Sequence, residues 1–123
     1  MAEHNKLGVW GEERAVGVLE ELGYFIRDRN WRFHHYELDI VAFDKQTLVF
    51  VEVKTRSSLE YGEPLVAVGP KKVRNLIQAA NQYIIENELL NTWRFDIICV
   101  YGNEVKSSYE HIIDAFDPFL LSF

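Results

Sequence analysis

Apolar residues recur along this chain with two spacings, one typical of helices and the other typical of strands. Between residues 5 and 23 they follow one face of a helix, at Leu7, Ala15, Val18, Leu19 and Leu22. Asn5 can cap the start of that helix, and Gly23 fits its end. A second stripe predicts a helix over residues 70–89, with Pro70 in its first turn. The apolar positions of that stripe are Val73, Leu76, Ile77, Ala80, Tyr83 and Ile84.

Segments rich in β-branched and aromatic residues lie between these helices and after them. They predict strands over residues 24–33, 38–43, 48–55, 93–101 and 109–116. A turn over residues 44–47 joins the second and third strands, and a loop over residues 56–69 precedes the second helix. The element order is therefore αβββαβ with one further strand, which predicts an α/β fold with helices on a mixed sheet.

Length and composition are consistent with one domain over residues 1–123, because 48% of the residues are apolar and can form a core. No apolar run approaches the roughly 18 residues of a membrane helix. The N-terminal residues lack the pattern of a signal peptide. We therefore expect a cytoplasmic protein with no membrane partner. Cys99, the one cysteine, lies in an apolar strand and is expected to be a buried thiol.

The net charge of −6, taken alone, argues against a nucleic-acid partner, since phosphate binders usually carry a basic excess. The charge is unevenly distributed, however, because residues 1–74 carry −1 and residues 75–123 carry −5. Between positions 54 and 74, five basic residues outnumber two acidic ones, which favours a local positive patch. The five are Lys54, Arg56, Lys71, Lys72 and Arg74.

Alternation along the second and third strands separates apolar from charged side chains, because successive side chains point to opposite faces. In the third strand, Glu52 and Lys54 share a face with Phe50, and the other face carries the valines at positions 49, 51 and 53. In the second strand, one face is expected to carry Leu38, Ile40 and Ala42.

A turn centred between Lys45 and Gln46 sets the register of this hairpin. It places Asp39 directly opposite Glu52, and Glu37 directly opposite Lys54. Opposed Cβ atoms lie about 4.5–5.5 Å apart, and like charges at that separation are destabilising. A shared proton, the Lys54 ammonium or a divalent cation would each compensate. The simpler interpretation is that the acids lie at a solvated sheet edge, but the apolar residues around Glu52 indicate a central strand.

The first helix offers a third carboxylate. At about 100° per residue, Glu12 falls at the edge of the buried stripe, whereas Glu13 points to solvent. Gly8 and Gly11 fall within that stripe, and glycine destabilises a helix by about 1 kcal/mol relative to alanine. Close approach of the helix to the sheet would explain both glycines and would bring Glu12 near the acid pair. An ordinary Glu near the helix N-terminus is the alternative.

Asp39, Glu52 and Lys54, with thirteen positions from the Asp to the Glu, resemble the PD-(D/E)xK nuclease motif. Their spacing and the helix that starts Gly8-x-x-x-Glu12 are similar to archaeal Holliday-junction resolvases. More closely, the chain resembles the YraN-like family of uncharacterised bacterial proteins. The matching stretches are Gly8-x-x-Gly11-Glu12-x-x-Ala15, Arg29-Asn30-Trp31-Arg32, Glu37-Leu38-Asp39-Ile40-Val41-Ala42, Phe50-Val51-Glu52-Val53-Lys54-Thr55-Arg56 and Arg94-Phe95-Asp96.

This resemblance implies a restriction-endonuclease-like αβββαβ core and a metal-dependent endonuclease that hydrolyses phosphodiester bonds in DNA, branched or damaged DNA being the expected substrate. Asp39, Glu52 and the Val53 carbonyl would hold Mg²⁺ or Mn²⁺, with Glu12 as a further ligand. Lys54 would position the attacking water or stabilise charge on the phosphate. The nucleic acid would contact Arg56, Lys71, Lys72 and Arg74. A homodimer is plausible for a small nuclease that cuts both strands.

Asp96 lies on a strand between apolar neighbours and is a candidate for orienting one of these ligands. His34 and His35 are expected in a turn, and the three tryptophans are expected in or beside the core. Two further functions remain open. The chain can be a non-catalytic module that binds nucleic acid or docks a protein, or a metal-free scaffold with an acidic C-terminal region.

Overall fold

The computed structural model describes residues 2–57 and 69–118 of the chain. Its elements are helix α1 (Ala2–Glu21), strands β1 (Phe25–Phe33), β2 (Tyr36–Asp44) and β3 (Thr47–Arg56), helix α2 (Pro70–Glu86), and strands β4 (Trp93–Gly102) and β5 (Ser107–Ile112). The strands form one sheet in the order β1-β2-β3-β4-β5. β3 and β4 run parallel, and the other neighbouring pairs are antiparallel. Residues 58–68 of the expected loop lie outside the described residues.

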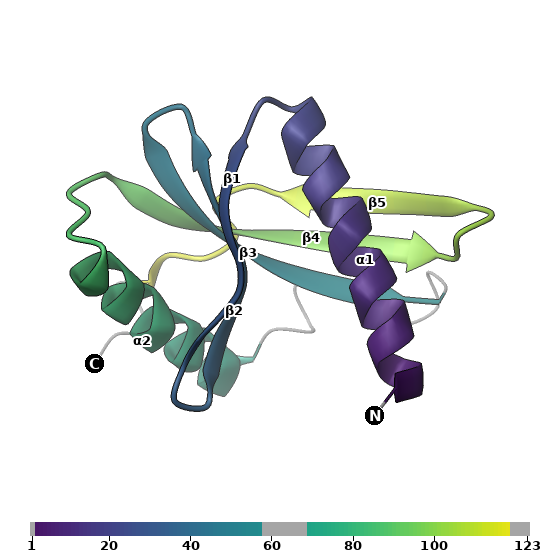
Figure 1. The fold of residues 1–123 in the computed structure, drawn as a ribbon, viewed down its shortest axis with the longest axis horizontal. Coiled ribbons are helices and arrows are strands. Elements are labelled where there is room, and N and C mark those ends of the chain that lie inside the picture. The colour runs from purple at the N-terminus through teal and green to yellow at the C-terminus, as the bar shows by residue number, and fades with distance from the viewer. Residues whose placement is uncertain (1, 58–68, 119–123) are drawn as a thin grey trace.

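The two helices cover opposite faces of this sheet (Figure 1). Alternate residues of β3 show the division, because Val49 and Val51 pack with α1, whereas Leu48 and Phe50 pack with α2. The α2 layer is rich in aromatic rings, and Tyr83 and Phe95 both lie within 6.0 Å of the Phe50 ring, centroid to centroid. The predicted α/β class with helices on a mixed sheet is therefore confirmed, and it is consistent with an α/β nuclease-like fold.

The ends of two elements differ from the prediction. α2 ends at Glu86 rather than near residue 89, because Glu88 adopts a positive φ of 51° and the Asn87 side chain caps the Tyr83 carbonyl. β5 ends at Ile112 rather than continuing to residue 116, because Asp114 has a positive φ of 55° and donates its N–H to Asp96. His34 and His35 lie in the β1–β2 turn, as expected.

The buried face of α1 is narrower than its sequence pattern suggests. Ala15, Val18 and Leu19 are buried as predicted, but Leu7 and Leu22 are exposed, because they lie near the ends of the helix beyond its contact with the sheet. α2 matches its stripe more closely, since Val73, Leu76, Ile77, Ala80 and Tyr83 are all buried. Cys99 is buried as well. The tryptophans are half-buried against the two cores, as expected.

The two glycines of the α1 stripe have different surroundings. A Cβ on Gly11 would lie 2.0 Å from Thr55 Oγ1, so the helix approaches β3 too closely there for any side chain. A Cβ on Gly8 would meet nothing within 4 Å, and Gly8 is exposed. The explanation by close approach is therefore confirmed for Gly11 and wrong for Gly8, where a side chain would have open space.

Leu38 does not share a face with Ile40 and Ala42, contrary to the prediction. Leu38 packs in the α2 cluster with Val41, whereas Ile40 and Ala42 pack in the α1 cluster. The alternation therefore breaks at Asp39. The described β2–β3 ladder also ends at this point, with the Ile40–Val51 pair. β2 thus turns away from β3 at the first residue of the acid pair.

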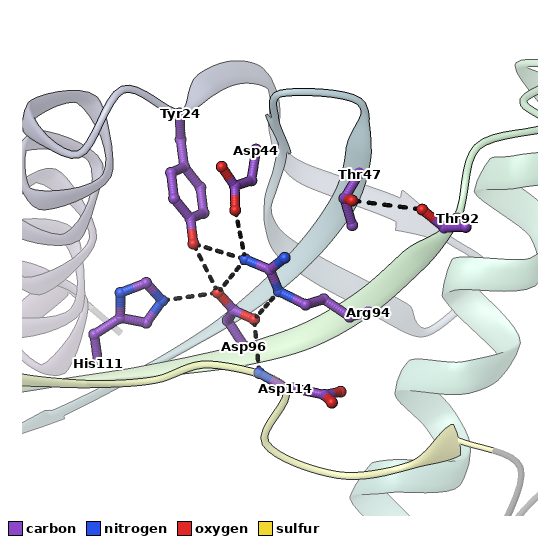
Figure 2. A network of polar contacts seen from close by, with 8 residues as sticks. All are labelled: Tyr24, Asp44, Thr47, Thr92, Arg94, Asp96, His111 and Asp114. Atoms are coloured by element: carbon purple, nitrogen blue, oxygen red, sulfur yellow. Dashed lines mark hydrogen bonds and ion pairs between the residues drawn. The ribbon is translucent and has the colours of Figure 1, made fainter.

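A buried polar cluster joins β4 to the ends of three other elements (Figure 2). Asp96 is fully buried, and its two oxygens accept hydrogen bonds from Arg94, Tyr24, His111 and the Asp114 N–H. Arg94 also contacts the Tyr24 hydroxyl at 2.7 Å and Asp44 at 3.1 Å. These contacts tie β4 to the α1–β1 corner, to the end of β2 and to β5.

The contacts of Asp96 give it a structural role. Burial alone would raise its pKa, but hydrogen bonds from His111, Arg94 and the Asp114 N–H outweigh that effect and hold the pKa below its ordinary value. Its hydrogen-bonding partners lie in this cluster and do not include Asp39 or Glu52. The prediction that Asp96 orients a metal ligand is therefore wrong, because its oxygens are already occupied by Arg94, His111, Tyr24 and the Asp114 N–H.

Within the described residues, neither helix is long and apolar enough to cross a membrane.

We predict that Gly11→Ala destabilises the protein, whereas Gly17→Ala stabilises it. The first change forces a Cβ against Thr55 and should cost about 1–3 kcal/mol, as for other overpacked sites. The second adds a Cβ with nothing within 4 Å and should stabilise the helix by about 0.5–1 kcal/mol. Chemical denaturation measures both. Combining Gly11→Ala with Thr55→Ala should recover part of the loss, and equal effects of the two single changes would contradict the close approach.

We predict that Asp96→Asn lowers the free energy of unfolding by about 3–5 kcal/mol at pH 7, because it leaves Arg94 beside a neutral partner. The folded-state pKa of Asp96 is lower than its unfolded-state pKa. The ionised side chain therefore contributes to the free energy of unfolding above the unfolded-state pKa, and this contribution is lost as the pH falls through the folded-state value. The difference between wild type and variant should therefore shrink on acidification. A constant difference between pH 7 and pH 3 would contradict this role.

Candidate metal centre

The β2–β3 hairpin has the predicted register. Asp44 pairs with Thr47 across a two-residue turn at Lys45 and Gln46, and the ladder continues to Ile40 opposite Val51. The next positions along the two strands are Asp39 and Glu52. The register therefore brings the two acids to the point where β2 leaves β3. Glu37 lies farther along β2 and forms an ion pair with Arg32 on β1 rather than with Lys54.

The Asp39 carboxylate takes the place of a backbone carbonyl of β2 as the acceptor of a hydrogen bond from β3. Its Oδ2 accepts a hydrogen bond of 2.9 Å from the Val53 N–H, which keeps the side chain against β3. Burial raises the pKa of Asp39 to about 8, and the neighbouring Glu52 carboxylate adds to the rise, while the Val53 N–H opposes it. Asp39 and Glu52 therefore interact closely, and Asp39 keeps its proton near neutral pH, which is one of the three ways predicted to offset the repulsion of the pair.

Glu52 is the more buried member of the acid pair, with 4% of its side chain exposed. One carboxylate oxygen, Oε2, lies 3.2 Å from Lys54 Nζ and 3.4 Å from Lys72 Nζ. The other oxygen, Oε1, is buried and has no hydrogen-bond partner within the described part of the chain. A buried, unpartnered carboxylate oxygen is costly, and such groups usually indicate a ligand, an ion or a water.

This donor set fits a hard divalent cation. Two adjacent carboxylates repel each other, one of their oxygens lacks a partner, and Mg²⁺ is commonly held by one or two carboxylates and several waters. Over residues 2–57 and 69–118, no three His, Cys, Asp or Glu side chains come together in a way that could hold a metal. Asp39 and Glu52 are therefore the two side chains that the described structure offers to such an ion.

Glu12 faces the sheet, as predicted, but its partners are on β1. Its Oε2 accepts hydrogen bonds from Arg29 Nε at 3.1 Å and from Asn30 Nδ2 at 2.9 Å. Glu13 points outward, also as predicted, and contacts Arg29 Nη1 at 2.7 Å. In this conformation Glu12 is thus bound to Arg29 and Asn30, and the structure does not bring it into a cluster with the acid pair.

The predicted phosphate-contacting residues fall into two groups. Lys72 reaches the site itself, where it contacts Glu52 together with Lys54. Lys71 and Arg74 are exposed on the first two turns of α2, and Arg56 is half-buried near the end of β3, where it donates to the Thr55 carbonyl. No role was predicted for Arg29, which contacts both Glu12 and Glu13 and is one of three arginines on β1, at positions 27, 29 and 32.

We predict that Asp39→Asn stabilises the protein in EDTA. Because the folded-state pKa of Asp39 is raised, folding takes up a proton between the unfolded-state and folded-state values, and wild-type stability falls as the pH rises through that window. The advantage of the variant should therefore grow from pH 5 to pH 8 and exceed about 1.4 kcal/mol, the equivalent of one pKa unit. A variant less stable than wild type at pH 8 would show that the carboxylate is favourably paired.

Comparison with known proteins places the chain in a family. The model of Uncharacterised protein family UPF0102 matches residues 11–100. A UPF0102 protein of Flavobacterium psychrophilum is 47% identical over 119 residues, covering 97% of this chain and 100% of the relative. A UPF0102 protein of Bacteroides thetaiotaomicron is 48% identical over 118 residues, covering 96% and 98%.

A third relative is similar over most of its length. The UPF0102 protein of Syntrophotalea carbinolica is 46% identical over 112 residues, which cover 90% of this chain and 91% of the relative. The resemblance to the YraN-like family is confirmed by these matches. With its family model covering most of the sequence and its relatives aligned over nearly their full length, the chain belongs to the uncharacterised protein family UPF0102.

Proposed function

We propose that this protein is a metal-dependent endonuclease of the PD-(D/E)xK type, which hydrolyses phosphodiester bonds in DNA. The observation that carries the proposal is the acid pair, in which Glu52 keeps a buried, unpartnered oxygen next to Asp39. A pair of like charges buried in a central strand is an unfavourable structural element by itself. It becomes favourable when it holds a cation.

Asp39 and Glu52 would hold Mg²⁺ or Mn²⁺, together with the Val53 carbonyl and water. When bound, the ion supplies Lewis-acid chemistry, which activates water and neutralises charge on a scissile phosphate. The Val53 N–H orients Asp39. Val53 would therefore hold one metal ligand, Asp39, in place and lie next to the other, Glu52. Glu12 remains a candidate third ligand that would have to leave Arg29.

Lys54 has the position of a residue that acts on the reacting groups. Its ammonium lies at Glu52 and its side chain is partly exposed, so it can donate a hydrogen bond to an attacking water or to a phosphate oxygen. Lys72, which contacts the same carboxylate oxygen, is more exposed and can contact a phosphate beside the scissile one. Arg56, Lys71 and Arg74 are proposed as outer contacts to the nucleic-acid backbone.

The motif resembles that of Holliday-junction resolvases, so branched or damaged DNA is the substrate class that we propose. Each chain carries one acid pair, so cutting both strands of such a substrate would require two copies, and we propose a homodimer for that case. The cytoplasm, where chromosomal DNA is accessible, is the proposed location.

A non-catalytic nucleic-acid-binding or protein-docking module is the second candidate. Two observations favour it, namely the net charge of −6 and the engagement of Glu12 with Arg29 rather than with the acid pair. Such a module would bind nucleic acid in a salt-sensitive manner without cutting it.

The test is a cleavage assay with labelled four-way junction, flap, linear duplex, single-stranded DNA and RNA. We predict that wild type cuts at least one substrate in Mg²⁺ or Mn²⁺ and none in EDTA. Asp39→Ala should be inactive, and Lys54→Ala should be slower by about 10²–10³, the loss typical of one transition-state donor. Glu20→Ala, which removes an exposed acid of α1, is the matched control and should cut like wild type.

The negative outcomes separate the candidates. Mobility shifts on native gels without cleavage in either metal would reject the nuclease and support the binding module. Cleavage that survives Asp39→Ala would show that the activity does not come from this site.

A further inference from the structure

A polar cleft of about 360 Å³ lies between α1 and the β1–β2 hairpin. Its lining includes Glu12 from α1, Arg29, Asn30 and Arg32 from β1, and Glu37 from β2. Gly8 lines the α1 side, where a side chain would have open space around it. The cleft therefore contains two guanidinium groups, and it is open at Gly8 because that residue has no side chain.

Arg29 is the central residue of this cleft. Its Nε and Nη2 lie 3.1 Å and 3.0 Å from Glu12 Oε2, and its Nη1 lies 2.7 Å from Glu13 Oε1. The Arg29 side chain is nevertheless 36% exposed, and that of Glu13 is 58% exposed. The guanidinium thus presents its fork of donors to two carboxylates on α1 while remaining open to solvent.

The backbone of β1 is irregular where it supplies these groups. Asn30 adopts a positive φ of 52°, a conformation that Asn tolerates better than most residues. As a result Arg29 and Asn30, although adjacent in sequence, both reach the same oxygen of Glu12. Irregular strand positions of this kind often re-aim side chains beside functional sites.

The cleft lies on the α1 side of the sheet at the level of the acid pair, whereas Lys72 of α2 contacts Glu52 from the other side. Arg29 pairs with Ile40 and Trp31 pairs with Leu38, so Asn30 lies at the level of Asp39, between these pairs. On α1, Gly11 packs against Thr55, two residues beyond the Val53 that binds Asp39. A nucleic-acid backbone that crossed the sheet at this level could therefore contact both the acid pair and the cleft.

We propose that this cleft is a phosphodiester-binding site for the nucleic-acid substrate, with Arg29 as the principal contact and Arg32 as the second. This inference rests on the proposed function and adds the surface that holds the substrate. In the free protein Glu12 and Glu13 occupy Arg29, and an incoming phosphate replaces them, because guanidinium binds phosphate through the same two-pronged contacts that it makes to carboxylates. That exchange releases Glu12 from Arg29.

Both arginines of the cleft are paired with carboxylates, Arg29 with Glu12 and Glu13 and Arg32 with Glu37, so a polyanion must displace these contacts. Arg32 is 73% exposed and shares the cleft with Arg29 three positions away, a separation of about 10 Å along an extended strand. That spacing favours a polymer, which can present a separate phosphate to each arginine, over a free phosphate. The Glu12 and Glu13 contacts would also weaken binding of small anions, since each must be displaced.

The test is fluorescence anisotropy with labelled duplex and four-way junction in EDTA, which separates binding from cleavage. We predict that Arg29→Ala and Arg32→Ala each weaken binding by at least about 5-fold and lower the slope of log affinity against log salt by about one. Lys45→Ala, a change in the exposed β2–β3 turn, should bind like wild type. Circular dichroism melts would establish that each variant is folded.

Glu13→Gln distinguishes a binding role of Arg29 from a structural one. It frees one prong of the guanidinium and should tighten binding, which a purely structural ion pair would not do. Glu20→Gln removes the same charge from an exposed position of α1 and should tighten binding less. Equal effects of the two changes would show that net charge alone accounts for the tighter binding, and would overturn the proposed exchange at Arg29.

The outcomes separate this inference from the proposed nuclease function. Binding that depends on Arg29 without cleavage in any metal supports the cleft and rejects the nuclease. Metal-dependent cleavage with binding that is sensitive to Lys71→Ala and Arg74→Ala but not to Arg29→Ala overturns the cleft alone. The cleft is also overturned if wild type binds no nucleic acid, or if inorganic phosphate at matched ionic strength competes as well as an oligonucleotide.

Discussion

The repulsion between two carboxylates at the fork of the β2–β3 hairpin is the constraint around which this molecule is arranged. Asp39 accepts the Val53 N–H, and Glu52 shares one oxygen between Lys54 and Lys72 and leaves the other without a partner. β2 turns away from β3 at this position, which opens the sheet beside both acids. The described chain therefore supplies part of the positive charge that the pair requires and leaves Glu52 Oε1 without a partner.

A second buried carboxylate shows by contrast what a structural acid looks like in the same fold. Asp96 is fully buried, and its oxygens are bound by Arg94, Tyr24, His111 and a backbone N–H. Its pKa is lowered, whereas that of Asp39 is raised. Burial raises the pKa of both acids, but hydrogen bonds from His111, Arg94 and the Asp114 N–H outweigh it at Asp96, whereas Glu52 adds to it at Asp39. The direction of the pKa shift therefore distinguishes Asp96, which stabilises the fold, from Asp39, whose ionised form destabilises it.

Much of this site could be predicted from the sequence because it depends on local rules. The two-residue turn and the alternation of side chains fixed the register that joins Asp39 to Glu52, and helical spacing placed Glu12 inward and Glu13 outward. Contacts between residues far apart in sequence could not be predicted in this way. They include the pairing of Glu12 with Arg29, the approach of Lys72 to Glu52 and the cluster around Asp96, all of which depend on how helices and loops dock on the sheet.

Binding of Mn²⁺, followed by electron paramagnetic resonance at neutral pH, tests the central claim most directly, because it requires no substrate. We expect wild type to bind one ion per chain, Asp39→Ala and Glu52→Gln to bind none under the same conditions, and Glu20→Gln to bind like wild type. Absence of binding by wild type at millimolar Mn²⁺, or equal binding by Asp39→Ala, would contradict the claim that the acid pair is a cation site.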